Sequence, residues 1–275
     1  MKEIVILCVN YNNSKEVVNY VEHLSEQTLF SRIDIVVVDN STDYEEYKTL
    51  SSVQLSYSNV RVLNSDENLG YFRGVNYGLT EYLRDNEMPN WVIISNTDIK
   101  FEDNEFLQRV INLYPKGIEG IIAPSIFSTY LEKDQNPYAT DRFSKRKLEF
   151  LRFLYKSTLL TFLANKLLNI KRKLNRSNLN INPQENREIY APHGAFMIIN
   201  RNYFEKGGNL DYKSFLFCEE IFIGEITRKI GTKVFYDNRL KVYHNEHSTI
   251  SLLRKKHLLK FSYDSVDYCL KEFYK

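Results

Sequence analysis

The chain has 275 residues, enough to bury one sizeable hydrophobic core, and we expect a single domain built from two halves. Its composition, 43% hydrophobic and 26% charged, is typical of a globular protein, and a net charge of +2 excludes the overall basicity of a nucleic-acid-binding protein. The three cysteines have no metal-site spacing, and no signal-peptide core or bilayer-length apolar run is visible, so we expect a reducing, cytoplasmic location.

The first predicted elements are two buried strands joined by a helix. Residues 4–9 form an apolar strand, the polar turn 10–14 caps a helix over about residues 15–27, and residues 33–38 form a second strand. This order predicts a right-handed parallel unit, so Asp39 lies at the same sheet edge as Asn10. A carboxylate there can accept hydrogen bonds from a base or a ribose, or it can cap the next helix.

A glycine-rich helix start follows a third strand at residues 60–63. Gly70, Gly74 and Gly78 recur every four residues, so they line one face of a helix that we expect to end near residue 85. Such a face lets N–H groups approach an anionic ligand, with Arg73 adding charge; close helix packing is the alternative. The spacing is neither that of a dinucleotide-binding loop nor that of a Walker loop.

Residues 91–98 run from an apolar strand into a short polar loop. The Val-Ile-Ile run predicts a strand buried on both faces, so Asn96 and Asp98 emerge at the carboxyl edge of a sheet, where open α/β sheets bind ligands. Hard divalent cations prefer oxygen ligands. Asp98 is therefore a predicted metal ligand with Asn96 as its polar neighbour, unless the loop is only a turn.

A basic insert follows a helix predicted at 105–113 and a strand predicted at 120–124. Between residues 141 and 176, eleven Lys and Arg residues alternate with Phe and Leu residues. This basic amphipathic helical stretch predicts binding to an anionic membrane surface. Binding of single-stranded nucleic acid and simple packing on the domain are the alternatives, and the first is disfavoured because the aromatic residues follow helical stripes. Residues 177–187 are expected to form a return loop.

The last third of the chain places further polar residues near strand ends. Residues 189–199 lead into a strand, and a loop at 206–211 precedes an aromatic segment that ends in Glu219 and Glu220. Adjacent carboxylates in such a setting are rarely buried without a function, although a helix N-terminus also favours glutamate. A helix at 221–230, a strand at 233–236 and an edge motif at 242–248 follow, with His244 and His247 three residues apart.

These motifs occur in an order that resembles family 2 glycosyltransferases. In the first half they are Val-Asn-Tyr-Asn at 9–12, Val-Val-Val-Asp-Asn-Ser at 36–41, Asn-Leu-Gly-x-x-x-Gly-x-Asn-x-Gly at 68–78 and Ser-Asn-Thr-Asp at 95–98. Gly-Ala-Phe-Met-Ile, a Gly-Gly loop, Phe-x-x-x-Glu-Glu and Val-Tyr-His resemble the family's acceptor half. Asn96 replaces the first Asp of the D-x-D metal motif, as in rhamnosyltransferase-like members that build bacterial polysaccharides. Glu220 replaces an Asp, and Phe222 stands where many members repeat one.

The resemblance implies an α/β fold of the glycosyltransferase-A type. It combines a mostly parallel nucleotide-binding sheet with a mixed acceptor-binding half and the basic helical insert. The expected divisions are a nucleotide-sugar-binding half at residues 1–127, the insert at 128–187, the acceptor and catalytic half at 188–250, and a C-terminal helical tail at 251–275.

The resemblance also assigns roles to particular residues. It implies a nucleoside-diphosphate sugar, a UDP- or dTDP-sugar, bound by Val9, Asn10, Tyr11, Asp39, Asn68, Gly70, Arg73, Asn76, Asn96 and Asp98. It implies Mg2+ or Mn2+ held by Asp98 and His244. Glu220 would act as the catalytic base, with Glu219 as the neighbouring carboxylate or as a group that binds acceptor hydroxyls.

The implied activity is metal-dependent transfer, with inversion, of a hexosyl or deoxyhexosyl group to a growing capsule or O-antigen polysaccharide. The acceptor is expected to be linked to a polyprenyl diphosphate and met by a cytoplasmic, peripheral enzyme at the inner face of the cell membrane, with no nucleic acid as partner. A non-catalytic nucleotide-sugar or glycan-binding protein is the alternative. A sugar nucleotidyltransferase is disfavoured because the turn at 10–13 lacks a glycine-rich, basic loop.

Overall fold

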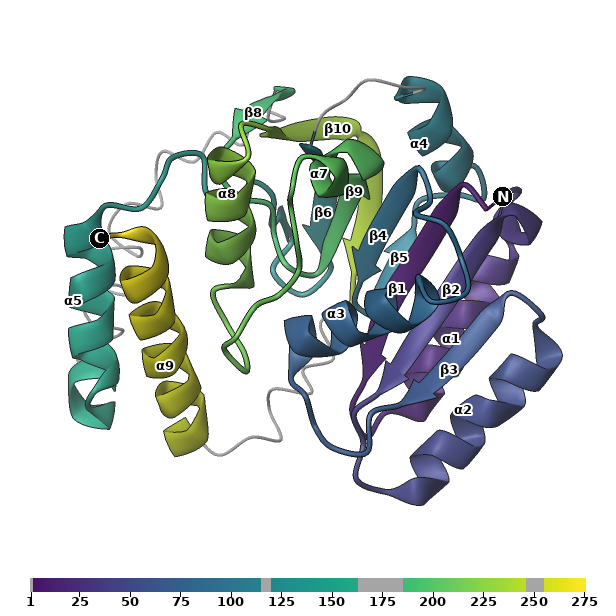
Figure 1. The fold of residues 1–275 in the computed structure, drawn as a ribbon, viewed down its shortest axis with the longest axis horizontal. Helices are drawn as coiled ribbons and strands as arrows, with labels where there is room; N and C mark the ends of the chain where they lie inside the picture. Colours follow the sequence, from purple (N-terminus) through teal and green to yellow (C-terminus); the bar gives the residue numbers. More distant parts are fainter. Residues whose placement is uncertain (1, 115–119, 163–184, 246–254) are drawn as a thin grey trace.

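A single mixed sheet runs through the molecule (Figure 1). The structure, a computed structural model, describes residues 2–114, 120–162, 185–245 and 255–275. Within these residues the strand order is β3-β2-β1-β4-β9-β6-β10-β5, with β7 paired to β6 and β8 paired to β10. The expected α/β class with a mostly parallel sheet is confirmed.

Four parallel strands form the first half of the sheet. They are β1 (Ile4–Asn10), β2 (Ile33–Asp39), β3 (Val60–Asn64) and β4 (Trp91–Ser95). Successive side chains enter cores on opposite faces: Ile4 and Ile6 on one side, Val5 and Leu7 on the other. The near-continuous Val and Ile runs that predicted these strands therefore reflect burial on both faces.

Helices cover both faces of the sheet (Figure 1). One core includes side chains of α1 (Ser14–Ser25), α2 (Tyr44–Ser56) and α4 (Phe106–Leu113), with η1 (Phe30–Arg32) beside it. The other includes side chains of α3 (Tyr71–Tyr82), α7 (Arg201–Glu205) and α8 (Glu219–Lys229). Helix α2 was not predicted, because it buries only Leu50 and Val53 and so has little apolar periodicity.

The regularly spaced glycines of α3 serve two different purposes. A Cβ on Gly74 would lie 3.1 Å from Val9, and a Cβ on Gly78 would lie 2.9 Å from Val38. These two glycines therefore let α3 pack closely on the strands. Of the three, only Gly70 lines the cavity described below, so the expected ligand-facing glycine face is wrong beyond the first position.

The second half of the sheet is mixed. Strand β9 (Phe196–Asn200) runs antiparallel to β4 and to β6 (Gly120–Ser128), and β10 (Lys233–His244) lies parallel to β6 and antiparallel to β5 (Ile99–Phe101). The short strands β7 (Lys133–Asp134) and β8 (Arg187–Ile189) pair antiparallel with β6 and β10, respectively. The strand expected at 233–236 and the edge motif expected from 242 form one strand, because β10 keeps pairing with β6 across an irregularity between Asp237 and Lys241.

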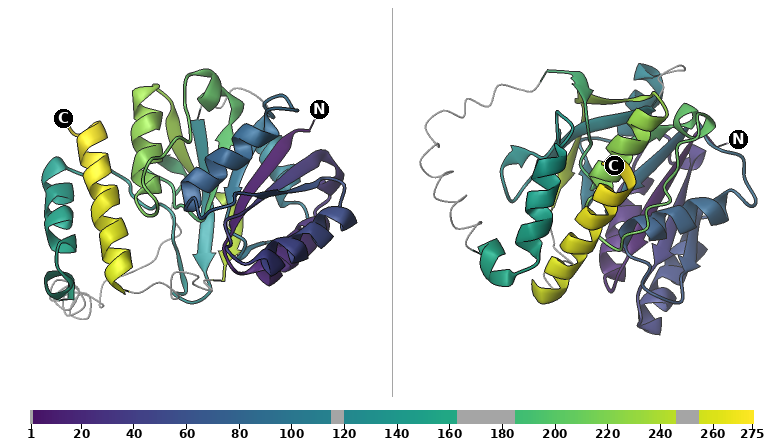
Figure 2. Two further views of the ribbon diagram at one scale, coloured as in Figure 1. Left: turned by 60° about the horizontal axis from the view of Figure 1, so that its bottom comes forward. Right: turned by 60° about the vertical axis from the view of Figure 1, so that its left-hand side comes forward.

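Two helices lie at one end of the molecule in Figure 1 and remain side by side in both views of Figure 2. Helix α5 (Lys145–Tyr155) packs on α9 (Lys255–Phe273) through a small separate core that contains Leu148 and Cys269. Arg152 of α5 also pairs with Asp267 of α9 at 2.7 Å. Only the first part of the basic insert is seen in this way, since residues 163–184 lie outside the described residues.

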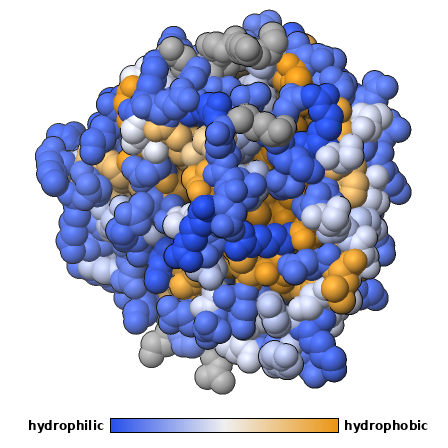
Figure 3. Space-filling view, turned by 45° about the vertical axis from the view of Figure 1, so that its right-hand side comes forward, coloured by the Kyte–Doolittle hydropathy of each residue, from blue (hydrophilic) through white to orange (hydrophobic). Residues whose placement is uncertain are grey.

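A helix that spans a bilayer needs about 20 consecutive, mostly apolar residues. Within the described ranges, none combines the length and the apolar character needed to span a membrane. On the face shown in Figure 3, hydrophilic residues dominate, and hydrophobic side chains show mainly in recesses.

Candidate functional site

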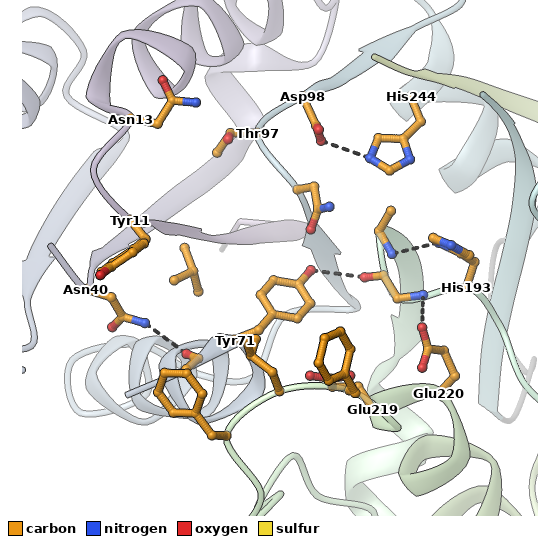
Figure 4. Close-up of a pocket in the computed structure, with 18 of the residues that line it drawn as sticks. Tyr11, Asn13, Asn40, Tyr71, Thr97, Asp98, His193, Glu219, Glu220 and His244 are labelled. Atoms are coloured by element: carbon orange, nitrogen blue, oxygen red, sulfur yellow. Dashed lines mark hydrogen bonds and ion pairs between the residues drawn. The ribbon is translucent and has the colours of Figure 1, made fainter. Parts of the chain in front are cut away.

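A cavity of about 680 Å³ lies where β1 and β4 end, at the edge of the sheet that carries the polar turns (Figure 4). Both strands run parallel, so the turns that follow them meet at this edge. One wall comes from the first half of the chain. The opposite wall comes from loop 193–195, segment 215–217, α8, β10 and α9.

The wall from the first half contains six of the residues predicted to bind a nucleotide sugar: Val9, Tyr11, Asn68, Gly70, Asn96 and Asp98. Asn68 accepts a hydrogen bond from the Gly70 N–H at 2.9 Å, and Asn40 donates one to the Gly70 carbonyl at 2.9 Å. Gly70 has φ 81°, and a Cβ there would overlap the Phe215 carbonyl group. Only glycine fits this position, which joins the two walls.

Asn10 and Asp39 are buried behind this wall and are not among the residues that line the cavity. Asn10 Nδ2 donates to Asp39 Oδ1 at 2.9 Å, and the Ser41 N–H donates to the same oxygen at 3.1 Å. The two side chains hold the turns after β1 and β2 together. The alternative predicted for Asp39, capping the next helix, is wrong, because Asp43 caps α2 by accepting a hydrogen bond from the Glu45 N–H at 3.0 Å.

Arg73 and Asn76 lie away from the cavity. With Tyr77, Thr80 and Lys213 they line a separate hollow of about 420 Å³. The reason is helical geometry: Gly74 and Gly78 face the strands, so residues 73, 76, 77 and 80 point elsewhere. The structure does not bring these two predicted donor-binding residues to the site.

Asp98 and His244, which the family resemblance assigned to one metal site, lie together at the cavity (Figure 4). His244 pairs with Ile99 across β10 and β5, which places its ring beside Asp98. Their Nε2 and Oδ1 atoms lie 3.1 Å apart, and both side chains are largely buried. The other imidazole nitrogen, Nδ1, lies 2.7 Å from Gln135 Oε1.

The Asp98–His244 pair has the character of an incomplete cation site. Asp98 Oδ1 is buried and finds no hydrogen-bond partner within the described part of the chain. A carboxylate oxygen and an imidazole nitrogen suit Mn2+, and Mg2+ accepts one or two protein carboxylates together with substrate phosphate oxygens. No group of three potential ligands occurs among the described residues. The two side chains therefore fit a metal ion that also binds a diphosphate. His247 lies outside the described residues.

His193 is a cavity residue that the sequence analysis did not select. Its ring centroid lies 6.2 Å from that of His244, and its Nδ1 accepts a hydrogen bond from the Ala195 N–H at 3.1 Å. Burial lowers the pKa of His193 to about 4, and the neighbouring His244 acts in the same direction. Neutral His193 therefore carries its proton on Nε2. Only the spatial fold reveals it, because a lone histidine in a loop has no distinctive pattern.

Glu219 and Glu220 form the first turn of α8, after Cys218 in a left-handed conformation with φ 62°. Glu220 Oε1 accepts a hydrogen bond from the Gly194 N–H at 3.3 Å (Figure 4). Burial raises the pKa of both carboxyls, and the Glu220 charge raises that of Glu219 further. Both line the cavity, which places one buried and one half-buried carboxyl opposite the turns of the first half.

An aromatic wall completes the cavity. Phe215 and Phe261 lie with ring centroids 4.7 Å apart, and both line the cavity beside Leu216 and Phe217. Phe261 belongs to α9, a helix whose contribution to the site was not predicted. No local motif marks it, since it reaches the cavity only because α9 packs back against this edge of the fold.

Comparisons with known proteins agree with this arrangement. The family model described as "Glycosyl transferase family 2" matches residues 4–208. No curated protein matched the sequence.

Solved structures share the fold at low sequence identity. A mannosyltransferase, PcManGT from Pyrobaculum calidifontis, in complex with GDP-Man and Mn2+, is 11% identical with a TM-score of 0.51, covering 98% of this chain and 74% of that one. GalNAc-T7 with UDP, GalNAc and Mn2+ is 12% identical with a TM-score of 0.59, over 98% of this chain and 57% of that one. TarS 1-349 from S. aureus is 10% identical with a TM-score of 0.53, covering 99% of this chain and 72% of that one.

Proposed function

The chain belongs to glycosyl transferase family 2, and we propose that it transfers a sugar from a nucleoside-diphosphate sugar to a hydroxyl group of a glycan. One observation carries the proposal: a single cavity joins the Asp98–His244 pair to Glu220. The Asp98–His244 pair is suited to a diphosphate with its metal ion, and the Glu220 carboxylate is suited to accept a proton. A protein that only binds glycans needs no buried, proton-accepting carboxyl opposite such a pair.

The nucleotide lies against the wall formed by Val9, Tyr11 and Asn40, with its diphosphate directed toward Asp98 and His244. Tyr11 offers an aromatic surface to the base, and Asn40 is already fixed by its hydrogen bond to Gly70. The resemblance to rhamnosyltransferase-like members makes UDP- and dTDP-sugars the donors to test first.

Asp98 Oδ1 and His244 Nε2 are the side-chain atoms that would hold Mg2+ or Mn2+. When bound, such an ion offsets the negative charge that develops on the departing nucleoside diphosphate. Asn96 lines the same part of the cavity, and its N–H donates to the Ala195 carbonyl at 2.8 Å. This hydrogen bond ties the loop that carries Asp98 to the loop at residues 193–195, so the donor side and the acceptor side of the cavity keep a fixed relative position.

Glu220 is the proposed general base of an inverting displacement. The acceptor hydroxyl oxygen forms a bond to the anomeric carbon while the bond from that carbon to the diphosphate oxygen breaks, and the hydroxyl proton passes to Glu220. A single displacement inverts the anomeric configuration. The burial that raises the pKa of Glu220 also makes its carboxylate a better proton acceptor near neutral pH.

The outward face of α5 supports an acceptor held at a membrane. Phe150 is 58% exposed and Phe153 is 53% exposed, one helical turn apart. Lys145, Arg146 and Lys147 are exposed on the same helix. Aromatic side chains beside basic ones suit an anionic bilayer surface. We therefore place the enzyme on the inner face of the cell membrane, acting on a polyprenyl-diphosphate-linked glycan of the capsule or O-antigen type.

The activity is tested by a screen of UDP- and dTDP-sugars, with and without Mn2+, for thermal stabilisation and for release of the nucleoside diphosphate. A donor of this class should stabilise the protein only when Mn2+ is present, and slow donor hydrolysis should accompany binding. Hydrolysis should disappear in the double variant that combines Glu219→Gln with Glu220→Gln, while donor binding persists. Failure of every nucleoside-diphosphate sugar to bind would refute the proposed function.

The membrane location is tested with vesicles of increasing anionic lipid content. Binding should grow with anionic lipid and weaken with salt, because the electrostatic attraction is screened. Replacing Lys145, Arg146 and Lys147 by Gln should release the protein. A charge-matched control replaces three exposed lysines elsewhere on the surface, Lys48, Lys133 and Lys229, and should keep it bound. Equal release in both triple variants would refute a role for α5.

A further inference from the structure

The turn after β7 is held rigidly on β6, and it presents a glutamine to the cavity. The Gln135 N–H donates to the Ile126 carbonyl at 2.8 Å, and Asp134 Oδ1 accepts from the Ile126 N–H at 2.9 Å. The next residue, Asn136, is fully buried and donates to the Pro124 carbonyl at 2.7 Å. The Gln135 side chain therefore starts from a fixed backbone and reaches the His244 ring.

The contact between Gln135 and His244 selects one form of the imidazole. Gln135 Oε1 lies 2.7 Å from His244 Nδ1, and an amide oxygen can only accept a hydrogen bond. Nδ1 must then carry a proton, and in the neutral imidazole this leaves a lone pair on Nε2. That lone pair faces Asp98 Oδ1 at 3.1 Å, so two electron-rich atoms point at each other in a buried site. A cation between or beside them removes this conflict.

The neighbouring His193 is set in the opposite form. Its ring Nδ1 accepts a hydrogen bond from the Ala195 N–H at 3.1 Å. The backbone N–H of His193 donates to Asn136 Oδ1 at 2.7 Å. Adjacent residues of one turn, Gln135 and Asn136, thus contact both histidines of the cavity. Gln135 fixes the His244 ring so that its Nε2 can accept. Asn136 fixes the backbone of His193, whose Nε2 carries the proton.

We propose that Gln135 is a positioning residue that holds His244 as its Nδ1–H tautomer and thereby aims Nε2, together with Asp98, at a divalent cation. The inference rests on the proposed metal-dependent transfer and assigns to it a residue that lies outside every motif named above. A hydrogen bond to the second nitrogen of a metal-binding histidine fixes the ring and raises its affinity as a ligand.

The first test reads the tautomers in the metal-free protein by nitrogen NMR of the histidine rings. We expect His244 to be protonated at Nδ1 and His193 at Nε2, with His244→Ala used to assign the signals. Gln135→Met, of similar length but without an acceptor, should let His244 populate the other tautomer and leave His193 unchanged. A wild-type His244 protonated at Nε2, or at both nitrogens, would overturn the inference.

The second test measures Mn2+ affinity by electron paramagnetic resonance, without any sugar donor. Gln135→Met should weaken Mn2+ binding by about 10- to 100-fold, the usual effect of removing an outer hydrogen-bond partner. Gln135→Glu keeps an acceptor oxygen and should bind Mn2+ at least as well as the wild type. Gln108→Met, at a half-buried glutamine of α4 that does not line the cavity, is the matched control and should bind normally.

The outcomes separate the inference from the function on which it rests. Normal Mn2+ affinity in Gln135→Met, alongside normal wild-type binding, would overturn the role of Gln135 and leave the metal site standing. Absence of Mn2+ binding by the wild-type protein would overturn both. Recovery of affinity in Gln135→Glu supports the inference, because a purely structural role of the amide would not respond to the acceptor oxygen alone.

Discussion

The two walls of the cavity are built in different ways. On the nucleotide side, Val9, Tyr11 and Asn40 all lie within two residues of a strand end, so parallel strands bring them together directly. On the acceptor side, Gly194, Glu220 and Phe261 come from a loop, the start of a helix and the C-terminal helix. The first wall is specified by local sequence and the second by tertiary packing. Changes in the nucleotide-side wall should therefore affect donor binding, and changes in the acceptor-side wall should affect acceptor binding and turnover.

The largest effect should come from Glu220→Gln. Glutamine keeps the shape and the hydrogen bond from Gly194 but cannot accept a proton, so turnover of the best donor should fall by about 10²- to 10⁴-fold. Donor affinity should change little, because Glu220 lies on the acceptor wall. Glu219→Gln should be milder. A nearly normal Glu220→Gln with an inactive Glu219→Gln would exchange their roles.

The pH dependence of turnover sharpens this assignment. Burial raises the pKa of Glu220, and the base must be deprotonated to act. Activity should therefore fall as the pH drops through a pKa above the usual range for glutamate, and the rate should be full above it. The residual activity of Glu220→Gln should lack this acidic limb. An acidic limb that persists unchanged in the variant would assign the titration to another group.

On the nucleotide side, Asp98→Ala should abolish the Mn2+ dependence of donor binding. Removal of the carboxylate takes away one of two protein ligands, so donor affinity in Mn2+ should fall by about 100-fold to its metal-free value. Circular dichroism and the unfolding midpoint serve as the fold control, because Asp98 sits at a turn outside both main cores. An unchanged, Mn2+-dependent affinity would remove Asp98 from the metal site.

The difference between the walls also explains what the sequence could predict. The main strands and the polar turns after them follow strong apolar runs, and their placement at one sheet edge by pattern was correct, while the pairing of Asp98 with His244 came from the family resemblance. Arg73 and Asn76 were misplaced because motif spacing does not show which face of α3 turns to the sheet. His193, Gln135 and Phe261 were missed because their positions depend on pairing between distant segments. Local signals thus locate a sheet edge and the Glu219–Glu220 pair, whereas the rest of the opposite wall needs the fold.

Gly70→Ala should disturb the junction of the two walls. The residue has φ 81°, and a Cβ would overlap the Phe215 carbonyl, so we expect a loss of unfolding free energy of roughly 1–3 kcal/mol or more, together with weaker donor binding. Gly207→Ala is the matched control: its φ is 91°, but nothing lies within 4 Å of its added Cβ. It should show backbone strain in urea unfolding without any change in donor affinity. Equal donor affinity in the two variants would argue against a ligand at this wall.

The smallest effect should come from Phe261→Ala. The Phe261 ring contacts the Phe215 ring in a tilted arrangement, with centroids 4.7 Å apart, and lines the acceptor side, so its loss removes one aromatic contact and part of the apolar wall. An aromatic contact contributes about 0.5–1.5 kcal/mol, which corresponds to a rise of roughly 2- to 10-fold in the acceptor KM. Donor affinity should stay constant, because the nucleotide wall is intact. Tyr130→Ala, which removes a side chain that is 80% exposed, should change neither constant. If Phe261→Ala instead weakened the donor and spared the acceptor, α9 would belong to the nucleotide side, and the division of the cavity into a locally specified wall and a wall assembled by packing would be wrong.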